Sequence, residues 1–362
     1  MRKILQKLLS GFVVRMANKY SSRPQKKRVH DALSKLYNEI QNNPGKRGLK
    51  LDFTERDSFI VFSDQHKGAR NFADDFGYAA NNYQAALNYY NQQQFTFISL
   101  GDSEELWENT LDDVKKHNKS SFAIETEFLK RKAFVKIFGN HDLYWDNDPL
   151  AAYQLEKIYG EKLKVFEGII LTTTITDQPL SIFLTHGHQG DVASDGNWFS
   201  KWFVSRVWAP LQSYLRINPN TPAFSNQLKT VHNQLMYEWA AAQQSVLITG
   251  HTHQPVFNSF THLERIYIKL DAARKANDIV EEEKLLAQLK KEKIMGAEIP
   301  AFTATKPNYF NTGCCCFSDG DITGLEITEG KIRLIKWGYR DDKSSQRIVL
   351  EETDLANLQH KV

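Results

Sequence analysis

The chain has 362 residues, and 41% of them are hydrophobic, 25% are charged and the net charge at pH 7 is +3. This is the composition of an ordinary soluble globular protein, and its length suits one large α/β domain with insertions or two modest domains. No apolar run approaches the ~18 residues that a bilayer-spanning helix needs, so we expect no transmembrane segment.

The N-terminal segment has a charge that the whole-chain average hides. Residues 1–50 contain 13 Lys and Arg against two acidic residues, which gives +11, while the remaining 312 residues carry −8. Apolar residues recur at helical spacing from Ile4 to Met16, and the basic residues lie mostly off that stripe. Such a basic amphipathic helix, over residues 1–20, either rests on an anionic membrane surface or packs on the body of the protein.

Two further features concern the cellular compartment. Gln6 and Lys7 interrupt what would be the apolar core of a signal peptide, so we expect no secretion. The three cysteines are consecutive, Cys314 to Cys316, which is poor geometry for a disulfide among themselves and lacks zinc-site spacing. We therefore predict reduced thiols in a buried strand and a cytoplasmic protein, either free or resting on an anionic membrane surface.

Short apolar runs with polar exits dominate the chain from about residue 58. Five of them share one form, with β-branched or aromatic residues followed by Gly, Asp, Asn or His: SFIVFSDQH, FTFISLGDSE, FVKIFGNHD, SIFLTHGHQGD and SVLITGHTHQP. Residues 79–92 and 122–131 can hold helices between the first three runs, and further strands are expected near 163–175 and 322–337. This alternation predicts an α/β layered fold with its loops gathered along one edge.

Two segments interrupt this alternation. Residues 190–245 are rich in aromatic residues, with Trp198 and Trp202 at helical spacing, and predict a helical cap whose tryptophans can form the core of a helix pair. Residues 263–295 predict a charged helical hairpin with a turn at Asn277 and Asp278. We therefore expect a basic segment over 1–50, a domain over 51–340 with these two insertions, and a C-terminal tail over 341–362 without assigned structure.

The polar residues that follow the five apolar runs together supply donors for metal ions. A sheet whose strands end at one edge would bring together seven oxygen and nitrogen donors: Asp64, His66, Asp102, Asn140, His186, His251 and His253. Uncompensated, these carboxylates and imidazoles would be poorly solvated in one pocket, which divalent cations correct. Carboxylate, amide and imidazole ligands without thiolate suit Mn²⁺, Fe or Zn²⁺, of which we expect Mn²⁺ first. Two ions bridged by one carboxylate fit the number of donors.

This arrangement predicts phosphate chemistry. Two metals roughly 3.5–4 Å apart clamp phosphoryl oxygens and generate a hydroxide nucleophile near neutral pH. Asn140 would ligate through a neutral oxygen. His141 beside it would then be free to protonate the leaving oxygen or to stabilise charge on the phosphoryl group, and Asp142 would orient the His141 ring.

The motifs SDQH, GDSEE, GNHD, THGH and GHTH, in this order over residues 58 to 330, resemble the calcineurin-like metallophosphoesterases. The resemblance implies a four-layer αββα sandwich with helical insertions. It also implies that one ion is held by Asp64, His66 and His253, that the other is held by Asn140, His186 and His251, and that Asp102 bridges the two.

A narrower resemblance lies in GDSEELWE, which is similar to the corresponding motif of UDP-2,3-diacylglucosamine pyrophosphatases at Gly101, Asp102, Glu105 and Trp107. It implies a lipid substrate at the inner membrane face, a peripheral membrane location, and a slot for acyl chains lined by aromatic residues of the insertion over 190–245. Those enzymes commonly show Gly-Asn-Arg-Asp, whereas GNHD is the form of the wider family, which includes protein phosphatases and nucleotide phosphodiesterases.

The sequence therefore predicts a hydrolase of phosphate esters or pyrophosphates that acts on a phosphorylated small molecule or lipid. A serine/threonine phosphoprotein or nucleotide phosphatase is the alternative, and a non-catalytic scaffold is the third reading. Nucleic acid is not expected as a partner, because the chain after residue 50 is acidic and shows no basic stripe.

Overall fold

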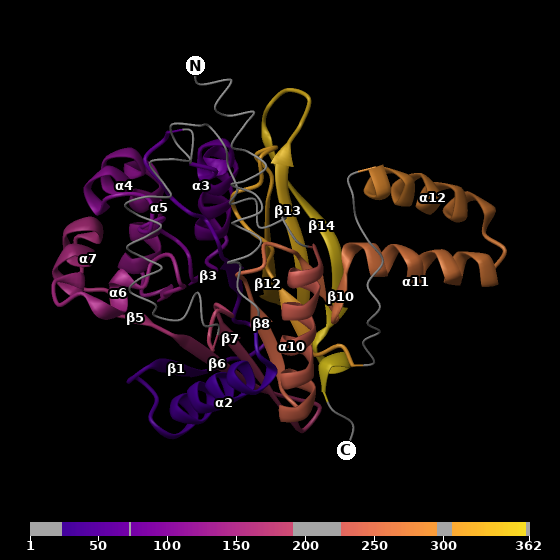
Figure 1. Cartoon of the computed structure of the whole chain (residues 1–362), viewed down its shortest axis with the longest axis horizontal. Coiled ribbons are helices and arrows are strands. Elements are labelled where there is room, and N and C mark those ends of the chain that lie inside the picture. The colour runs from indigo at the N-terminus through magenta and orange to yellow at the C-terminus, as the bar shows by residue number, and fades with distance from the viewer. Residues whose placement is uncertain (1–23, 72–73, 191–225, 295–305, 360–362) are drawn as a thin grey trace.

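The computed structural model describes residues 24–71, 74–190, 226–294 and 306–359. In these residues two seven-stranded sheets pack face to face, and helices cover both outer faces (Figure 1). The first sheet contains, from edge to edge, β14 (Ser345–Asp354), β13 (Lys331–Tyr339), β12 (Ile322–Thr328), β2 (Phe59–Phe62), β3 (Thr96–Leu100), β4 (Phe134–Ile137) and β5 (Val165–Phe166). The second contains β1 (Gly48–Asp52), β6 (Gly168–Ile175), β7 (Gln178–Thr185), β8 (Val246–Thr249), β11 (Tyr309–Asn311), β9 (Val256–Phe257) and β10 (Phe260–Thr261).

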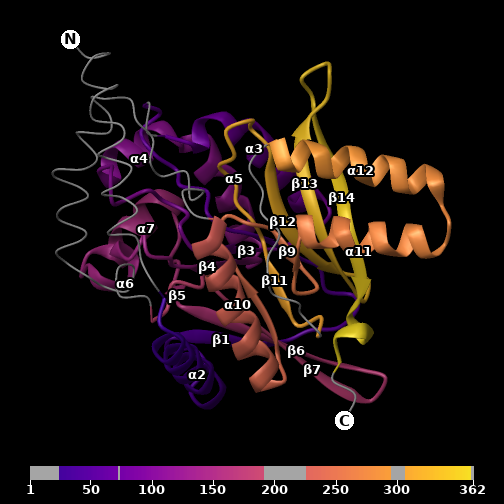
Figure 2. The same cartoon turned by 45° about the vertical axis from the view of Figure 1, so that its right-hand side comes forward.

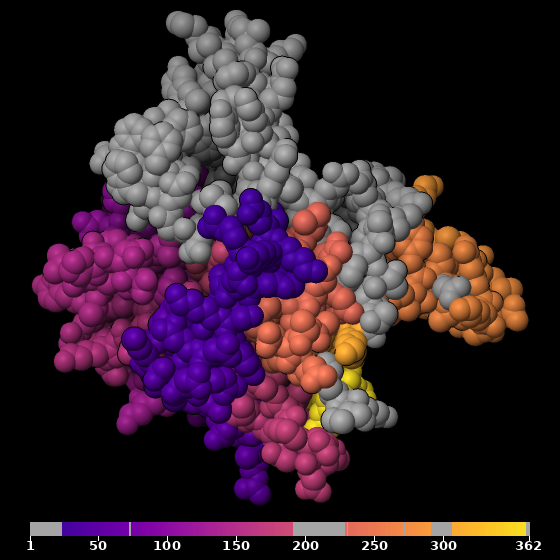
Figure 3. Space-filling model, turned by 60° about the horizontal axis from the view of Figure 1, so that its bottom comes forward, coloured from indigo at the N-terminus to yellow at the C-terminus, as the bar shows by residue number. Residues whose placement is uncertain are grey.

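Helices complete the four layers. The outer face of the first sheet packs on α3 (Phe76–Gln92), α5 (Lys119–Lys130) and α7 (Ala151–Tyr159), beside the shorter α4 (Leu111–His117) and α6 (Tyr144–Asn147). The outer face of the second sheet packs on α2 (Lys26–Asn42) and α10 (Asn226–Gln243), which lie side by side (Figure 2 and Figure 3). The fold is thus the α/β sandwich with helical insertions that the sequence predicts.

The central strands show why their sequences read as unbroken apolar runs. In β2, Ile60 and Phe62 join the cluster under α3 and α5, while Phe59 and Val61 join the cluster between the two sheets. A strand buried on both faces needs apolar side chains at every position, and β2 is buried throughout. The same burial on both faces applies to β8 in the second sheet.

Two segments that the sequence sets apart from the domain have described residues that pack on its sheets. Of residues 1–50, α2 buries Val29, Leu33, Leu36 and Ile40 against the second sheet, and β1 pairs with β6. Of residues 341–362, the described part contains β14, which pairs along β13, and a 3₁₀ turn (Leu355–Leu358) that buries two leucines. The expected amphipathic helix over residues 1–20 lies outside the described residues.

The two insertions differ in what is described. Of residues 190–245, the part over 226–243 is α10, whereas Trp198 and Trp202 lie outside the described residues. Helices α11 (His262–Lys275) and α12 (Ile279–Ile294) form a hairpin that projects from the body, with a small apolar cluster of its own. Thr261 and Glu264 cap α11 reciprocally, and Asn277 turns the chain with φ +54°. None of the described helices is both long and apolar enough to cross a bilayer.

Candidate metal centre

The predicted site residues follow the carboxyl ends of strands from both sheets. Asp64 and His66 follow β2, Asp102 follows β3 and Asn140 follows β4, and these three strands are parallel neighbours. In the second sheet His186 follows β7, and His251 and His253 follow its parallel neighbour β8. Because parallel strands end at the same edge, the loops that carry these residues meet.

The backbone at the site is in an uncommon conformation. Asp64, His66, Asp102, His251 and His253 all have positive φ, between +50° and +68°. For residues other than glycine this left-handed conformation costs about 1–3 kcal/mol and persists only where the surroundings impose it. Its concentration at five predicted ligands indicates a functional site.

Glycines before the site residues allow the loops to approach closely. A Cβ at Gly139 would collide with Asp102 Oδ1, and a Cβ at Gly250 would collide with Asp64 Oδ2. The glycines of GNHD and GHTH are therefore required because another strand's carboxylate occupies the space of a side chain. This gives a steric reason for the glycine that starts each of these motifs.

The first group of donors contains Asp64, His66 and His253. His253 Nε2 lies 3.1 Å from Asp64 Oδ1 and 3.2 Å from His66 Nε2. The Nδ1 atom of His66 lies 2.7 Å from Glu105 Oε2 and donates to that carboxylate, which leaves the lone pair of its Nε2 directed at the group. Asp64, His66 and Asp102 offer ligand atoms that lie within 4.8 Å of one another.

The second group contains Asp102, His186 and His251, whose ligand atoms also lie within 4.8 Å of one another. His186 Nε2 is 3.1 Å from Asp102 Oδ2, while its Nδ1 donates to the Leu100 carbonyl at 2.9 Å. Asn140 is buried on the adjacent loop. Among the described residues Asn140 Oδ1 has no hydrogen-bond partner. Asp102 belongs to both groups, as a bridging ligand would.

His141 lies beside these groups and is half-buried. Its Nδ1 is 2.7 Å from Glu105 Oε2, so one carboxylate contacts both His66 and His141. Its ring stacks on Trp107, with centroids 4.5 Å apart and an interplanar angle of 18°. Burial alone would lower the pKa of His141, but the charges of Glu105 and Asp102 raise it.

Asp142, which we expect to orient the His141 ring, contacts the backbone of two loops. Its carboxylate accepts hydrogen bonds from the backbone N–H groups of Ser103 (2.9 Å) and Gly139. Glu105 is the carboxylate that contacts that ring. The residue pattern alone could not choose between Glu104 and Glu105. Only the resemblance of GDSEELWE to the pyrophosphatase motif marked Glu105 and Trp107.

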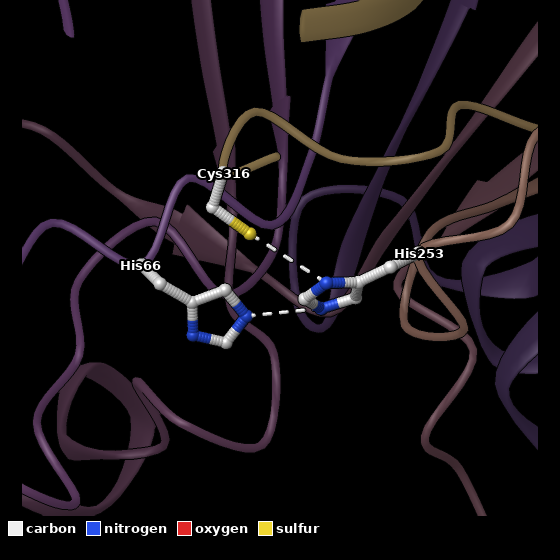
Figure 4. A group of neighbouring side chains, drawn as sticks. All are labelled: His66, His253 and Cys316. Atoms are coloured by element: carbon white, nitrogen blue, oxygen red, sulfur yellow. Dashed lines mark hydrogen bonds between the residues drawn. The ribbon is translucent and has the colours of Figure 1, made fainter. Parts of the chain in front are cut away.

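Cys316 is a further neighbour that the sequence did not single out. Its Sγ lies 3.5 Å from Nδ1 of His253 (Figure 4). His66, His253 and Cys316 offer three possible ligand atoms within 4.8 Å of one another. Three consecutive cysteines carry no signal that tells which thiol faces the site.

The donor set suits cations on physical grounds. Burial would raise the pKa of Asp102, but the His186 and His141 rings hold it below its usual range. Burial likewise opposes a charged His186, yet Asp102 and Asp64 raise its pKa to about 9, whereas burial and the nearby His232 and His186 lower the pKa of His251. Buried carboxylates, facing imidazole nitrogens and an unpaired amide oxygen together form a polar cavity that divalent cations would neutralise.

Comparison with known families agrees with this geometry. The profile of the calcineurin-like phosphoesterases matches residues 58–255, more than half of the chain. The chain belongs to the calcineurin-like phosphoesterase family. It is thus a metal-dependent hydrolase of phosphate esters, and the family's dinuclear divalent centre has plausible ligand groups here. The predicted superfamily is confirmed, whereas the narrower pyrophosphatase assignment, the identity of the metals and the roles of individual residues remain predictions.

Other comparisons add no argument about function. No curated protein sequence matches the chain. Vacuolar protein sorting 29 from Cryptosporidium parvum is 11% identical, with a TM-score of 0.35 over 83% of this chain and 100% of that one. A Vps29 mutant from Entamoeba histolytica is 12% identical, with a TM-score of 0.32 over 81% and 99%. A structure described as a 5′-nucleotidase from Staphylococcus aureus is 12% identical, with a TM-score of 0.31 over 84% and 55%.

Proposed function

We propose that the chain hydrolyses a phosphate ester or pyrophosphate with two divalent cations. One cation would be held by Asp64, His66 and His253 and the other by Asn140, His186 and His251, with Asp102 shared between them. The observation that carries this proposal is the convergence of oxygen and nitrogen donors from the ends of five strands on one buried, polar position. When bound, the ions would polarise the phosphoryl group and activate a water molecule.

The protein residues around the ions would hold and move protons. His141 is half-buried, and its Nδ1 faces Glu105, so its Nε2 is the ring nitrogen available to a substrate oxygen. The charges of Glu105 and Asp102 favour the imidazolium, which can donate a proton to the leaving oxygen. Trp107 restrains the ring from one face, and Glu105 fixes its rotation. We therefore assign His141 as the general acid and Glu105 as its positioning residue.

The first substrate to test is a lipid-linked pyrophosphate of the UDP-diacylglucosamine type. The supporting observation is that Glu105 and Trp107, which the chain shares with that motif, both contact His141. A phosphoprotein or nucleotide phosphatase remains the alternative, because GNHD places a histidine where those pyrophosphatases commonly have arginine. A non-catalytic scaffold is the less favoured reading, because a scaffold has no need of His141 or of the predicted ligands.

Purified full-length protein should be assayed with Mn²⁺ against three substrates, namely a UDP-linked diacyl sugar, a phosphopeptide and a bis-aryl phosphate. We expect manganese-dependent turnover that chelation abolishes, and that an Asp102→Asn variant lacks. Preference for the diacyl sugar supports the lipid assignment, and preference for either other substrate rejects it. Absence of turnover on all three, by protein that binds two Mn²⁺ per chain, would contradict the catalytic proposal.

A further inference from the structure

The two histidines of the first donor group are held in matching ways. Each presents Nε2 to the group, where the two Nε2 atoms are 3.2 Å apart, and each presents Nδ1 to another side chain. For His66 that partner is the Glu105 carboxylate, at 2.7 Å. For His253 it is the sulfur of Cys316, at 3.5 Å (Figure 4). The two rings therefore differ chiefly in which atom accepts the hydrogen bond from Nδ1–H.

The identity of that acceptor matters because a histidine binds a cation through a nitrogen that carries no proton. A neutral imidazole has one proton, and a hydrogen-bond acceptor beside Nδ1 keeps it there, so that Nε2 offers its lone pair. In known metal sites the acceptor is usually a carboxylate, a backbone carbonyl or a water molecule. Here a buried sulfur, 9% exposed, occupies that place.

We propose that Cys316 is the positioning residue of His253. The sulfur of Cys316 accepts a hydrogen bond from Nδ1–H of His253, and this directs Nε2 of the ring to the first ion. The inference rests on the proposed two-cation function. It assigns a task to one of the three cysteines and separates it from its neighbour Cys315, which lies in the core under α3 with its Sγ 3.9 Å from the Thr323 carbonyl. Cys314 lies within hydrogen-bonding range of both Cys316 and His253, so it is the competing acceptor.

Backbone contacts explain why this loop places a sulfur at the site. The Cys315 N–H donates to the Asp64 carbonyl at 3.1 Å, and the Cys314 N–H donates to Thr323 Oγ1 at 3.3 Å. The first bond ties the segment after β11 to the loop that carries Asp64 and His66, and the second ties it to β12. Cys315 then faces the core, and Cys316 faces His253. Of the two cysteines that flank Cys315, Cys316 is the one whose Sγ lies 3.5 Å from Nδ1 of His253.

The test measures Mn²⁺ binding by calorimetry to ion-free full-length protein. Cys316→Ala should lower the affinity of one of the two ions by ~10–100-fold, the usual cost of losing a partner of a ligating histidine. Cys316→Ser should recover part of that loss, because a hydroxyl also accepts. Cys315→Ala is the matched control for loss of a buried sulfur and should bind both ions as the wild type does. Equal affinity in Cys316→Ala and wild type, or a larger loss in Cys314→Ala, would overturn the assignment.

A second readout uses the wild type and does not depend on how the variants fold. In the Co²⁺-loaded wild type, the Nδ1–H of His253 should give a hyperfine-shifted, slowly exchanging proton resonance. A thiolate-to-cobalt charge-transfer band would show instead that the sulfur binds the ion directly, and would overturn a positioning role. Failure of the wild type to bind Co²⁺ or Mn²⁺ at all would contradict the proposed function, whereas normal binding without that resonance would contradict this inference alone.

Discussion

Two charged clusters are built from adjacent residues on the same two loops, and they differ in whether their polar atoms are satisfied. His66 and Glu105 face the candidate metal centre, whereas Lys67 and Glu104, one position away on each loop, face the interior. A parallel bridge between Lys67 and Glu104 sets this alternation. In the outer cluster ring nitrogens face one another, and the side-chain oxygen of Asn140 nearby has no hydrogen-bond partner among the described residues.

The inner cluster pairs every charge it buries. Glu104 contacts the ammonium groups of Lys136 and Lys67, at 2.9 and 3.3 Å, and accepts from the Trp145 indole at 2.7 Å. Glu125 on α5 contacts Lys67 at 2.5 Å and accepts from two tyrosine hydroxyls. Burial would raise the pKa of Glu104, but Lys136 and Lys67 hold it at about 2. The comparison indicates that this cluster supports the loops, and it agrees with the proposal that the outer cluster performs the chemistry.

The largest effect on stability should come from opening the inner cluster. Lys67→Met leaves Glu125 and one side of Glu104 without their cation in a region of 0% exposure, which typically costs about 3–5 kcal/mol of unfolding free energy. Denaturant unfolding of the ion-free protein measures this loss.

The matched control is the double variant Lys67→Met with Glu125→Gln, which removes both members of the pair. It should recover a large part of the loss, because the amide oxygen still accepts from one tyrosine hydroxyl and less buried charge is left uncompensated. Equal destabilisation of the single and double variants would contradict the view that the buried charge is the cause.

The next largest effect should fall on turnover. His141→Ala removes the proposed general acid from the outer cluster, and we expect kcat to fall by ~10²-fold or more, while the metal content and the unfolding free energy stay near those of the wild type. Turnover, metal analysis and denaturant unfolding on one preparation separate these quantities. A near-normal kcat with intact ions would remove the role assigned to this residue.

Glu105→Gln should have a smaller effect, spread over two functions. The variant keeps an acceptor for only part of the contact with His66 and His141, so the affinity for one Mn²⁺ should fall by ~10-fold or more and turnover should fall with it. Asp112→Asn, at an exposed carboxylate on α4, is the control and should change neither quantity. Unchanged Mn²⁺ affinity in Glu105→Gln would show that Glu105 does not position His66.

The smallest effect should come from an exposed ion pair on the helix that carries Glu125. Lys130 and Glu127 on α5 are 2.7 Å apart and mostly exposed. Lys130→Ala should leave the unfolding free energy unchanged within experimental error, because water screens such pairs. A loss similar to that of Lys67→Met would show that burial is not what distinguishes the two lysines.

The sequence predicted the parts of the fold that have strong apolar patterns. The strands β2, β3 and β4 are buried on one or both faces and end in glycine and polar residues, so their ends could be located. Strand β14 was missed because it is an edge strand with many half-exposed, polar residues. Helix α2 was assigned to a separate basic segment, although its apolar positions pack on the second sheet.

The sequence predicted the site residues because each motif marks the end of a strand. Contacts within the site depend on which way each residue faces, and that is set by pairing between loops distant in sequence. In a run of identical residues, the sequence does not show which side chain faces the metal centre. This applies to Glu104 and Glu105, and to Cys315 and Cys316. The bridge from Lys67 to Glu104 and the hydrogen bond from Cys315 to Asp64 decide it.

The central claim is that donors from five strand ends hold two cations that share Asp102. Anomalous scattering from crystals of the full chain soaked in Mn²⁺ tests it directly. We expect two peaks with Asp102 in contact with both, one beside Asp64, His66 and His253 and the other beside Asn140, His186 and His251. A single peak, or ions bound away from Asp102, would contradict the account.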